Sequence, residues 1–127
     1  MTTSSNSTTQ NPQTTFTNNS VFIDQVGTGN VAEATVISNS SQVAITQDGD
    51  FNEARLFLNA LNIDQTVLQV GNNNSFSDFI NSGAPDHGGT FIQQGNNNSI
   101  IRHNTNSISQ RINILQTGNQ NIEIRNF

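Results

Sequence analysis

The sequence predicts an all-β protein, a two-sheet parallel in-register β-solenoid of five strand-turn-strand repeats of about 22 residues each. Three observations lead to this fold class. One six-residue string recurs five times at nearly constant spacing. Apolar and polar residues alternate around that string, which is the period of a β-strand. Side-chain amides, 22 Asn and 12 Gln in 127 residues, are far more frequent than in ordinary globular chains.

The recurring string is Gln-x-Gly-x-x-Asn, and an apolar residue stands two positions before each Gln. Successive Gln residues of the string are 22, 22, 24 and 23 positions apart, which amide richness alone does not produce. The predicted ladder positions are Gln25, Gln47, Gln69, Gln93 and Gln116 with Asn30, Asn52, Asn74, Asn98 and Asn121; the turn glycines are Gly27, Gly49, Gly71, Gly95 and Gly118; the apolar core positions are Ile23, Ile45, Val67, Phe91 and Ile114.

Within each repeat, the alternation predicts one strand before the turn and another after it. In the first repeat, alternate residues of 21–25 share one face, and alternate residues of 32–36 share one face after the turn. The Gly and the Asn-rich residues between these strands favour the positive φ angles of a tight turn. Before the fourth repeat, a Gly- and Pro-containing insertion, residues 83–89, predicts a bulging loop with an exposed His87.

Stacking of the repeats follows from their size, because two short strands cannot bury their apolar residues alone. Equivalent residues then lie roughly 4.8 Å apart, and each Gln or Asn of the string hydrogen-bonds to its equivalents above and below. A buried amide without such a partner costs about 1 to 3 kcal/mol. On the outer face, Glu33 is predicted to pair with Arg55. One inward position holds Asp78, Arg102 and Arg125 in the later repeats; either an ion-pair ladder or an early end or shift of the strand explains them.

Two segments divide the chain. Residues 1–19 form a polar Thr-, Ser-, Asn- and Gln-rich N-terminal arm, and residues 20–127 form the solenoid. The arm has neither the basic start nor the apolar stretch of a secretory signal peptide. No apolar run in the chain is long enough for a membrane-spanning helix, so membrane insertion is not expected.

The composition argues against several classes of function. The net charge is −5, from four Arg and nine acidic residues without Lys, so neither a nucleic acid nor an anionic membrane is an expected partner. Cysteine is absent, which excludes a disulfide framework and a thiolate metal site. No motif predicts a catalytic residue, a metal site or a cofactor, and the protein is expected to be non-enzymatic.

A second set of apolar residues alternates with the core positions and is predicted to face outward. These residues are a candidate interface with another subunit. The open ends of a short solenoid add to this expectation, because their strands offer unpaired backbone groups. The candidate interface residues are Phe22, Leu68, Ile92, Leu115, Ile122 and Ile124. The expected partners are copies of the same chain and other structural proteins of the assembly.

The Gln-x-Gly-x-x-Asn core, its preceding apolar residue and its spacing resemble the curlin repeat of curli fibre subunits, over residues 20–127. The resemblance implies a two-sheet β-solenoid that polymerises end to end into extracellular amyloid fibres of a biofilm matrix, with the stacked Gln and Asn as its register ladder. The chain departs from the family pattern at the second Gln of each repeat, where Val36, Leu58, Ile80, Asn104 and Phe127 stand.

The function expected from the sequence is that of a structural protein that acts by self-assembly or docking. Two settings stay open. A bacteriophage virion component, such as a fibre, decoration or tail-associated protein, is favoured by the lack of a signal peptide and by the outward apolar residues. The alternative is a curli-type extracellular functional-amyloid fibre subunit. A carbohydrate-binding module is disfavoured, because Tyr and Trp, which stack on sugars, are absent.

Overall fold

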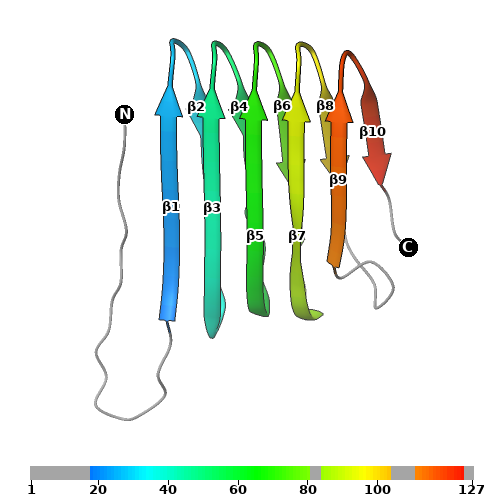
Figure 1. The fold of residues 1–127 in the computed structure, drawn as a ribbon. Helices are drawn as coiled ribbons and strands as arrows, with labels where there is room; N and C mark the ends of the chain where they lie inside the picture. Colours follow the sequence, from blue (N-terminus) through cyan, green and yellow to red (C-terminus); the bar gives the residue numbers. More distant parts are fainter. Residues whose placement is uncertain (1–17, 81–83, 104–110, 125–127) are drawn as a thin grey trace.

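Two parallel β-sheets face each other in the structure, a computed structural model that describes residues 18–80, 84–103 and 111–124 (Figure 1). The long-strand sheet consists of β1 (Asn18–Val26), β3 (Ser40–Asp48), β5 (Ala60–Val70), β7 (Ala84–Gln94) and β9 (Arg111–Thr117). The short-strand sheet consists of β2 (Val31–Ala32), β4 (Glu53–Ala54), β6 (Ser75–Asp78), β8 (Ser99–Arg102) and β10 (Asn121–Ile124). The part of the chain that the structure describes contains no helix.

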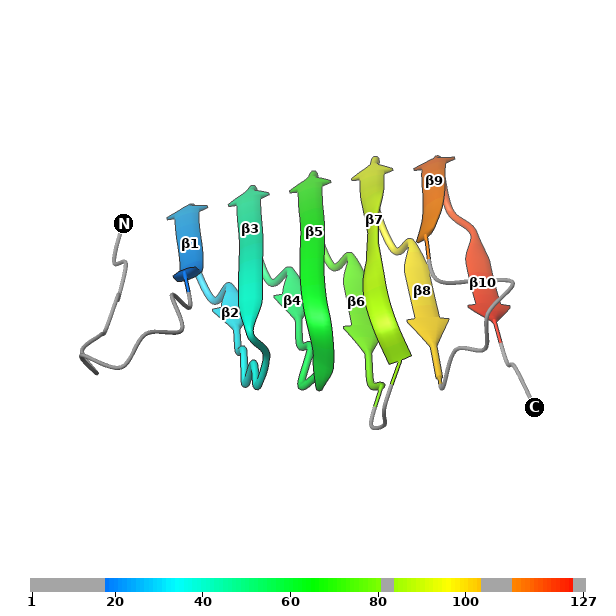
Figure 2. The same ribbon diagram turned by 90° about the horizontal axis from the view of Figure 1, so that it is seen from below.

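The chain runs along a long strand, turns into a short strand and returns to the next long strand. We call each long strand and the short strand that follows it a rung, so that rung 1 is β1 with β2 and rung 5 is β9 with β10. Neighbouring strands pair in parallel, in the orders β1-β3-β5-β7-β9 and β10-β8-β6-β4-β2. Figure 2 shows the long strands along one side of the solenoid and the short strands along the other. The predicted two-sheet parallel in-register β-solenoid is confirmed.

Equivalent residues of successive rungs lie side by side. In the long-strand sheet, Gln25, Gln47, Gln69, Gln93 and Gln116 pair in this order. Burial specifies this register, because a slip of one residue would turn every core side chain of a strand to the outer face.

The insertion before rung 4 does not form the predicted loop. Ala54 and Phe76 pair in the short-strand sheet and are 22 positions apart, whereas Ala60 and Ala84 pair in the long-strand sheet and are 24 apart. The two additional residues therefore lie between Phe76 and Ala84. Most of residues 83–89 belong to β7, because pairing with β5 outweighs the local turn preference of Gly and Pro. His87 is consequently buried, and its predicted exposure was wrong.

The first described residue, Asn18, already belongs to β1 and pairs with Ser40 of β3. Residues 1–17 of the predicted arm lie outside the described residues, as do Asn104, Arg125 and Phe127.

The core lies between the two sheets, and among the described residues it is fully closed in rungs 2 to 4 and at the connecting residues Leu56, Leu58 and Ile80. Its buried apolar residues are Val43, Ile45, Ala54, Leu56, Leu58, Ala60, Ile63, Val67, Phe76, Ile80, Phe91 and Ile100. The residues that pack against this cluster but stay only partly buried are Val21, Ile23, Ala32, Ala34 and Val36 at rung 1 and Ile112, Ile114 and Ile122 at rung 5. Within the described residues, a terminal rung pairs with another rung on one side only, and its inward side chains keep part of their apolar surface exposed.

Candidate functional site

A ladder of Gln amides runs through the core beside the turns. Gln25 Nε2 donates to Gln47 Oε1 at 2.6 Å, and the same hydrogen bond recurs from Gln47 to Gln69 (2.7 Å), from Gln69 to Gln93 (2.8 Å) and from Gln93 to Gln116 (2.8 Å). The last four side chains are buried, and Gln25 at the end is half-buried. The first four amides of the ladder thus all donate toward rung 5.

The second Nε2 hydrogen of these amides binds the short-strand sheet. It donates to a backbone carbonyl of the preceding rung: Gln47 to Val31 (3.0 Å), Gln69 to Glu53 (2.9 Å), Gln93 to Ser75 (2.9 Å) and Gln116 to Ser99 (3.1 Å). Gln116 has no further Gln above it in the chain, and its Nε2 also donates to the carbonyl of Gln120 at 3.2 Å. The ladder therefore connects successive rungs and also ties the two sheets together.

The Asn residues of the string form a second ladder at the turns. Asn30 Oδ1 accepts from the backbone N–H of Asn52 at 2.9 Å and from its Nδ2 at 3.3 Å. Asn52 Oδ1 accepts in the same way from Asn74 (3.0 and 3.1 Å), and Asn74 Oδ1 from Asn98 (3.1 and 3.0 Å). Each Asn side chain therefore supplies hydrogen bonds between rungs at the turn, where the backbone pairing of the strands is interrupted. These hydrogen bonds satisfy the buried Asn amides without water.

Rung 5 departs from the predicted ladder. Asn98 Oδ1 accepts from the backbone N–H of Gln120 at 3.1 Å, and Asn121 instead pairs in register with Ser99. The turn of rung 5 is thus one residue shorter than the turn of rung 4. The assignment of Asn121 to the ladder was wrong, because the string alone does not reveal the length of the turn.

This one-residue difference also reverses the predicted faces of β10. Ile122 is in register with Ile100 and packs against the core, and Ile124 is in register with the buried Arg102. Their expected outward orientation was therefore wrong. The exposed residue between them is Glu123.

The turn glycines allow the rungs to approach each other closely. All five adopt positive φ angles. A Cβ on Gly71, whose φ is +120°, would lie 2.0 Å from the carbonyl oxygen of Gly95, so no other residue fits there without a shift of the backbone. Gly118, with φ +94°, has no atom of the described residues within 4 Å of the same position, because it lies in the terminal rung.

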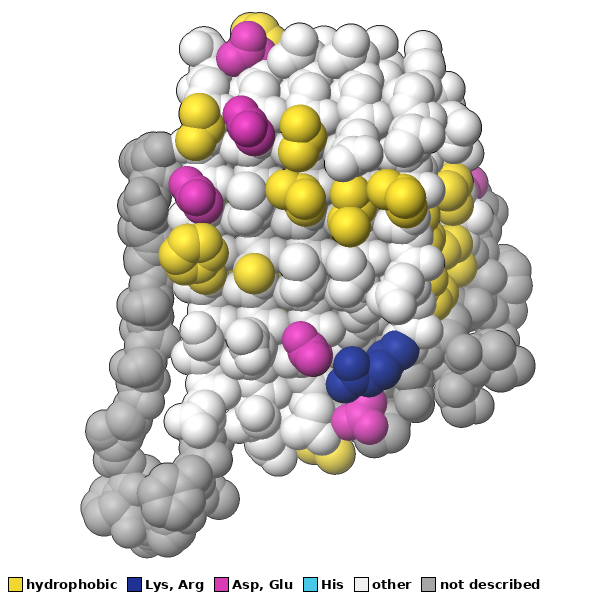
Figure 3. Space-filling view, in the orientation of Figure 1, with side chains coloured by type: hydrophobic (Ala, Val, Ile, Leu, Met, Phe, Trp, Pro, Cys, Tyr) yellow, Lys and Arg dark blue, Asp and Glu magenta, His cyan; other side chains and the backbone are white. Residues whose placement is uncertain are grey.

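An apolar row lies on the outer face of the long-strand sheet. Leu68, Ile92 and Leu115 are neighbours in register on β5, β7 and β9, and Leu115 is 64% exposed. Figure 3 shows hydrophobic side chains gathered over this part of the sheet. Phe22, 49% exposed, belongs to a different row, in which its neighbour is Ala44. Of the six candidate interface residues, Leu68, Ile92 and Leu115 thus form one outward row, and Phe22 lies outside that row.

A charged cluster is buried between rungs 3 and 4. Asp78 in β6 and Arg102 in β8 are neighbours in register, and both are fully buried. His87 Nε2 lies 3.0 Å from Asp78 Oδ2, and its Nδ1 lies 2.9 Å from an amino nitrogen of Arg102. Gln65 Nε2 donates to Asp78 Oδ2 at 2.6 Å. The ion pair that the sequence left open is present, and its partners His87 and Gln65 were not predicted.

Arg102 is accommodated by the composition of the long-strand sheet. The guanidinium lies 5.2 Å from the centre of the Phe91 ring and donates to the carbonyl of Gly88 at 3.3 Å. Gly89 stands in register with Gln65 and contributes no side chain there. Burial lowers the pKa of Arg102, and Asp78 opposes that shift. Arg102 Nε, 3.5 Å from Asp78 Oδ1, makes no hydrogen bond, so the cluster is imperfectly satisfied.

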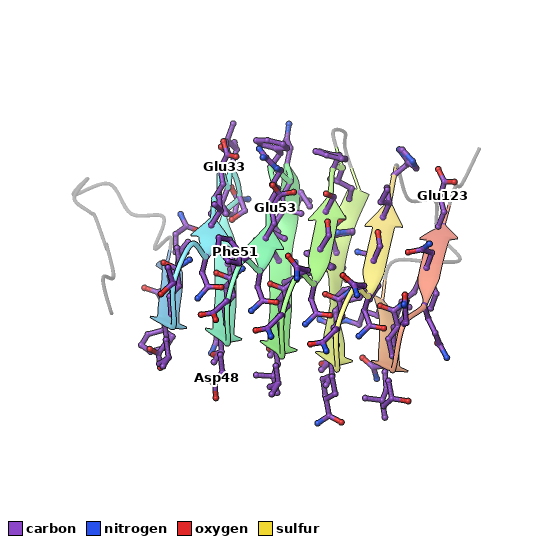
Figure 4. The ribbon with its side chains drawn as sticks, turned by 90° about the horizontal axis from the view of Figure 1, so that it is seen from above. Glu33, Asp48, Phe51, Glu53 and Glu123 are labelled. Carbon is purple, nitrogen blue, oxygen red and sulfur yellow. The ribbon has the colours of Figure 1, made fainter. Side chains whose placement is uncertain are left out.

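The outer face of the short-strand sheet carries exposed charges. Arg55 binds Glu33 Oε2 at 3.0 Å and Glu53 Oε2 at 2.9 Å, which confirms the predicted Glu33–Arg55 pair. The two carboxylates, with Glu53 dominant, raise the pKa of Arg55. Figure 4 shows Glu33 and Glu53 near one end of this face and Glu123 at the other, with Asp48 on the opposite side of the molecule. Glu123 contacts His103 at 3.1 Å.

Within residues 18–80, 84–103 and 111–124, no helix is long and apolar enough to cross a membrane. No group of three or more His, Cys, Asp or Glu side chains in these ranges could hold a metal ion.

In a comparison with known protein families, the model of the curlin associated repeat matches residues 38–77, a range that covers β3 to β5 and most of β6. No curated protein and no solved structure matches the chain.

Proposed function

We propose that this chain, which carries the curlin associated repeat within a β-solenoid, is a structural subunit that polymerises end to end into a fibre. One observation carries the proposal: the apolar residues of both terminal rungs are only partly buried, whereas the equivalent residues of rungs 2 to 4 are closed off from water. Completely burying an exposed Val or Ile side chain contributes about 1.5 to 3 kcal/mol. A second copy at each end would supply this burial.

The repeat itself indicates how two copies meet. If rung 1 of one copy continues the register of rung 5 of another, Gln116 meets Gln25 of the next copy, as Gln93 meets Gln116 within the chain. Ile114 then meets Ile23, and Ile112 meets Val21. Such a contact joins two different surfaces and does not close on itself, so that it generates a filament of indefinite length.

The test is polymerisation of the purified chain, followed by sedimentation velocity and thioflavin T fluorescence. Ile114→Lys introduces a charge into the half-buried surface of rung 5, and Thr117→Lys introduces the same charge on the exposed face of the same strand. We expect Ile114→Lys to block fibre growth and Thr117→Lys to leave it near the unmodified rate. Circular dichroism checks that both variants keep their β-sheet content. Equal growth of the two variants, or an unmodified chain that stays monomeric, contradicts the proposal.

An extracellular matrix fibre is the setting that the match to the curlin associated repeat supports. Electron microscopy of the native source, with an antibody against this chain, tests it. Unbranched fibres outside the cells that carry the label are expected. Label confined to finite symmetric particles contradicts this setting.

A virion component is the second candidate, and one specific observation favours it. The row of Leu68, Ile92 and Leu115 on the outer face is not needed for end-to-end stacking and offers a surface for docking on another structural protein. The same images test this setting, since label at constant copy number on purified particles supports it. Label that is absent from particles opposes it.

A further inference from the structure

We propose that the buried pair Asp78–Arg102, together with His87, fixes which rungs can be neighbours and so opposes out-of-order stacking of rungs from different copies of this chain. The inference concerns contacts between copies and therefore rests on the proposed function. The proposed function depends on the residues at the two ends of the solenoid. The inference concerns a buried pair in the middle of the solenoid, which determines the order of the rungs.

The ladders cannot by themselves specify the order of the rungs. Gln stands on Gln in every step of the long-strand sheet, and Asn stands on Asn at the turns of rungs 1 to 4. A slip by one whole rung, 22 to 24 residues, preserves each of these hydrogen bonds. The same holds when a rung of one copy inserts between rungs of another, which is the hazard of repeat proteins.

One inward row of the short-strand sheet does distinguish the rungs. Asp78 pairs in register with Arg102, and Arg102 with Ile124. Continuing the register from Ala54 and Phe76 by two residues brings Leu56 beside Asp78. In rung order this row reads Ala34, Leu56, Asp78, Arg102 and Ile124. Its two charges therefore occur at one step only, between rungs 3 and 4.

A slipped neighbour would leave a buried charge without its partner. If rung 4 stood directly on rung 2, Arg102 would face Leu56, and the carboxylate of Asp78 would be missing from the position 3.5 Å from Arg102 Nε. Both side chains are fully buried, so water could not replace the partner. An isolated buried charge is strongly unfavourable, and single polar pairs in repetitive interfaces are known to fix register for this reason.

His87 makes the contributions of rungs 3 and 4 to the cluster different. It comes from β7 of rung 4 and contacts both Asp78 and Arg102, whereas the equivalent residue of rung 3 is Ile63. Gln65 of rung 3 donates to Asp78 from the same sheet. The four polar side chains are thus divided between rungs 3 and 4, and the cluster is complete only when these two rungs are adjacent.

The test uses engineered cysteines, because the chain has none of its own. Ala44 on β3 and Thr90 on β7 lie in one outward row but are separated by Thr66 of β5, so they are not neighbours in the native order. Chains with Ala44→Cys and chains with Thr90→Cys are unfolded, mixed, refolded and oxidised. A disulfide between the two kinds of chain reports rung 4 of one copy against rung 2 of another.

We expect little of this disulfide in the native background and at least a tenfold higher yield when Asp78→Leu, His87→Ile and Arg102→Leu are combined. The matched control removes an exposed pair instead, by Glu33→Gln with Arg55→Gln, and is expected to leave the yield unchanged. The swapped pair, Asp78→Arg with Arg102→Asp, keeps complementary charges and is expected to keep the yield low even if the apolar variant folds poorly.

Equal disulfide yields in the native and apolar backgrounds would overturn the inference, and so would an equal rise in the exposed-pair control. Fibre growth of the native chain is measured in parallel. If fibres form while the disulfide yields are equal, the inference fails and the proposed function stands. If no fibres form, the proposed function fails whatever the disulfide yields are.

Discussion

At the scale of single residues, Gln93 takes part in the Gln ladder in both directions. Its Oε1 accepts from Gln69 at 2.8 Å, and its Nε2 donates to Gln116 and to the carbonyl of Ser75. The adjacent Gln94 is exposed on the outer face of the same strand. The two residues therefore provide a direct comparison of a ladder amide with a surface amide in one sequence context.

We expect Gln93→Leu to lower the free energy of unfolding by about 2 to 5 kcal/mol, because it leaves buried groups of Gln69 and Gln116 without a partner. Gln94→Leu removes the same amide from the surface and is expected to change stability little. Urea unfolding followed by circular dichroism measures both. Similar midpoints for the two variants would mean that the ladder does not stabilise the rungs.

Arg102 is the second residue on which the structure depends. Arg102→Met removes the positive charge and leaves Asp78 buried without it, so we expect a loss of about 3 to 5 kcal/mol in unfolding free energy. Arg55→Met, which removes an exposed guanidinium, is expected to have a much smaller effect. Thermal melting of the two variants provides the measurement, and an equally stable Arg102→Met would contradict the importance of the buried pair.

At the scale of the elements, the turns control how closely the rungs stack. Gly71→Ala would place a methyl group 2.0 Å from the carbonyl oxygen of Gly95, whereas Gly118→Ala meets no described atom within 4 Å. Both glycines have positive φ, so both variants carry the same kind of backbone strain, about 1 to 3 kcal/mol. We expect Gly71→Ala to be the more destabilising by more than 1 kcal/mol, because it adds a collision to that strain. Urea midpoints that agree within error would show that the stacking distance does not depend on this turn.

The sequence predicts these elements well where the pattern is repeated and poorly where it is interrupted. The alternation and the string identify a strand on each side of the turn in rungs 1 to 4, although the first half of β7 was expected to be a loop. They also identify the core positions Ile45, Val67 and Phe91, which are buried. The face of β10 was predicted wrongly, because Gln120 and Asn121 are both amides and only the turn geometry decides which one follows Asn98.

The buried cluster could be predicted only in part. Asp78 and Arg102 stand at one position of the repeat and suggested an ion pair, which the structure contains. Gln65 occupies a position that holds Val21, Val43 and Ile112 in other rungs, so the pattern indicated an apolar neighbour there. His87 lies in residues 83–89, whose Gly and Pro residues favoured a loop. Their contribution depends on side chains from two sheets that meet in space, and no local sequence signal reports such a meeting.

At the scale of the whole molecule, we propose that further copies of the chain add to each end of the solenoid and continue both sheets. The core is closed in the middle and open at rungs 1 and 5, and the registers of the two ends are compatible. A fibre built in this way contains one chain for every five strands along its axis.

Mass per unit length of the fibre, measured by scanning transmission electron microscopy, tests this claim most directly. Five strands at roughly 4.8 Å each extend about 24 Å. A chain of 13.8 kDa therefore predicts about 0.6 kDa per Å for a single column, and whole multiples of this value for bundled columns. Closed particles of fixed size, or fibres whose mass per length falls between these multiples, would contradict end-to-end stacking of the solenoid.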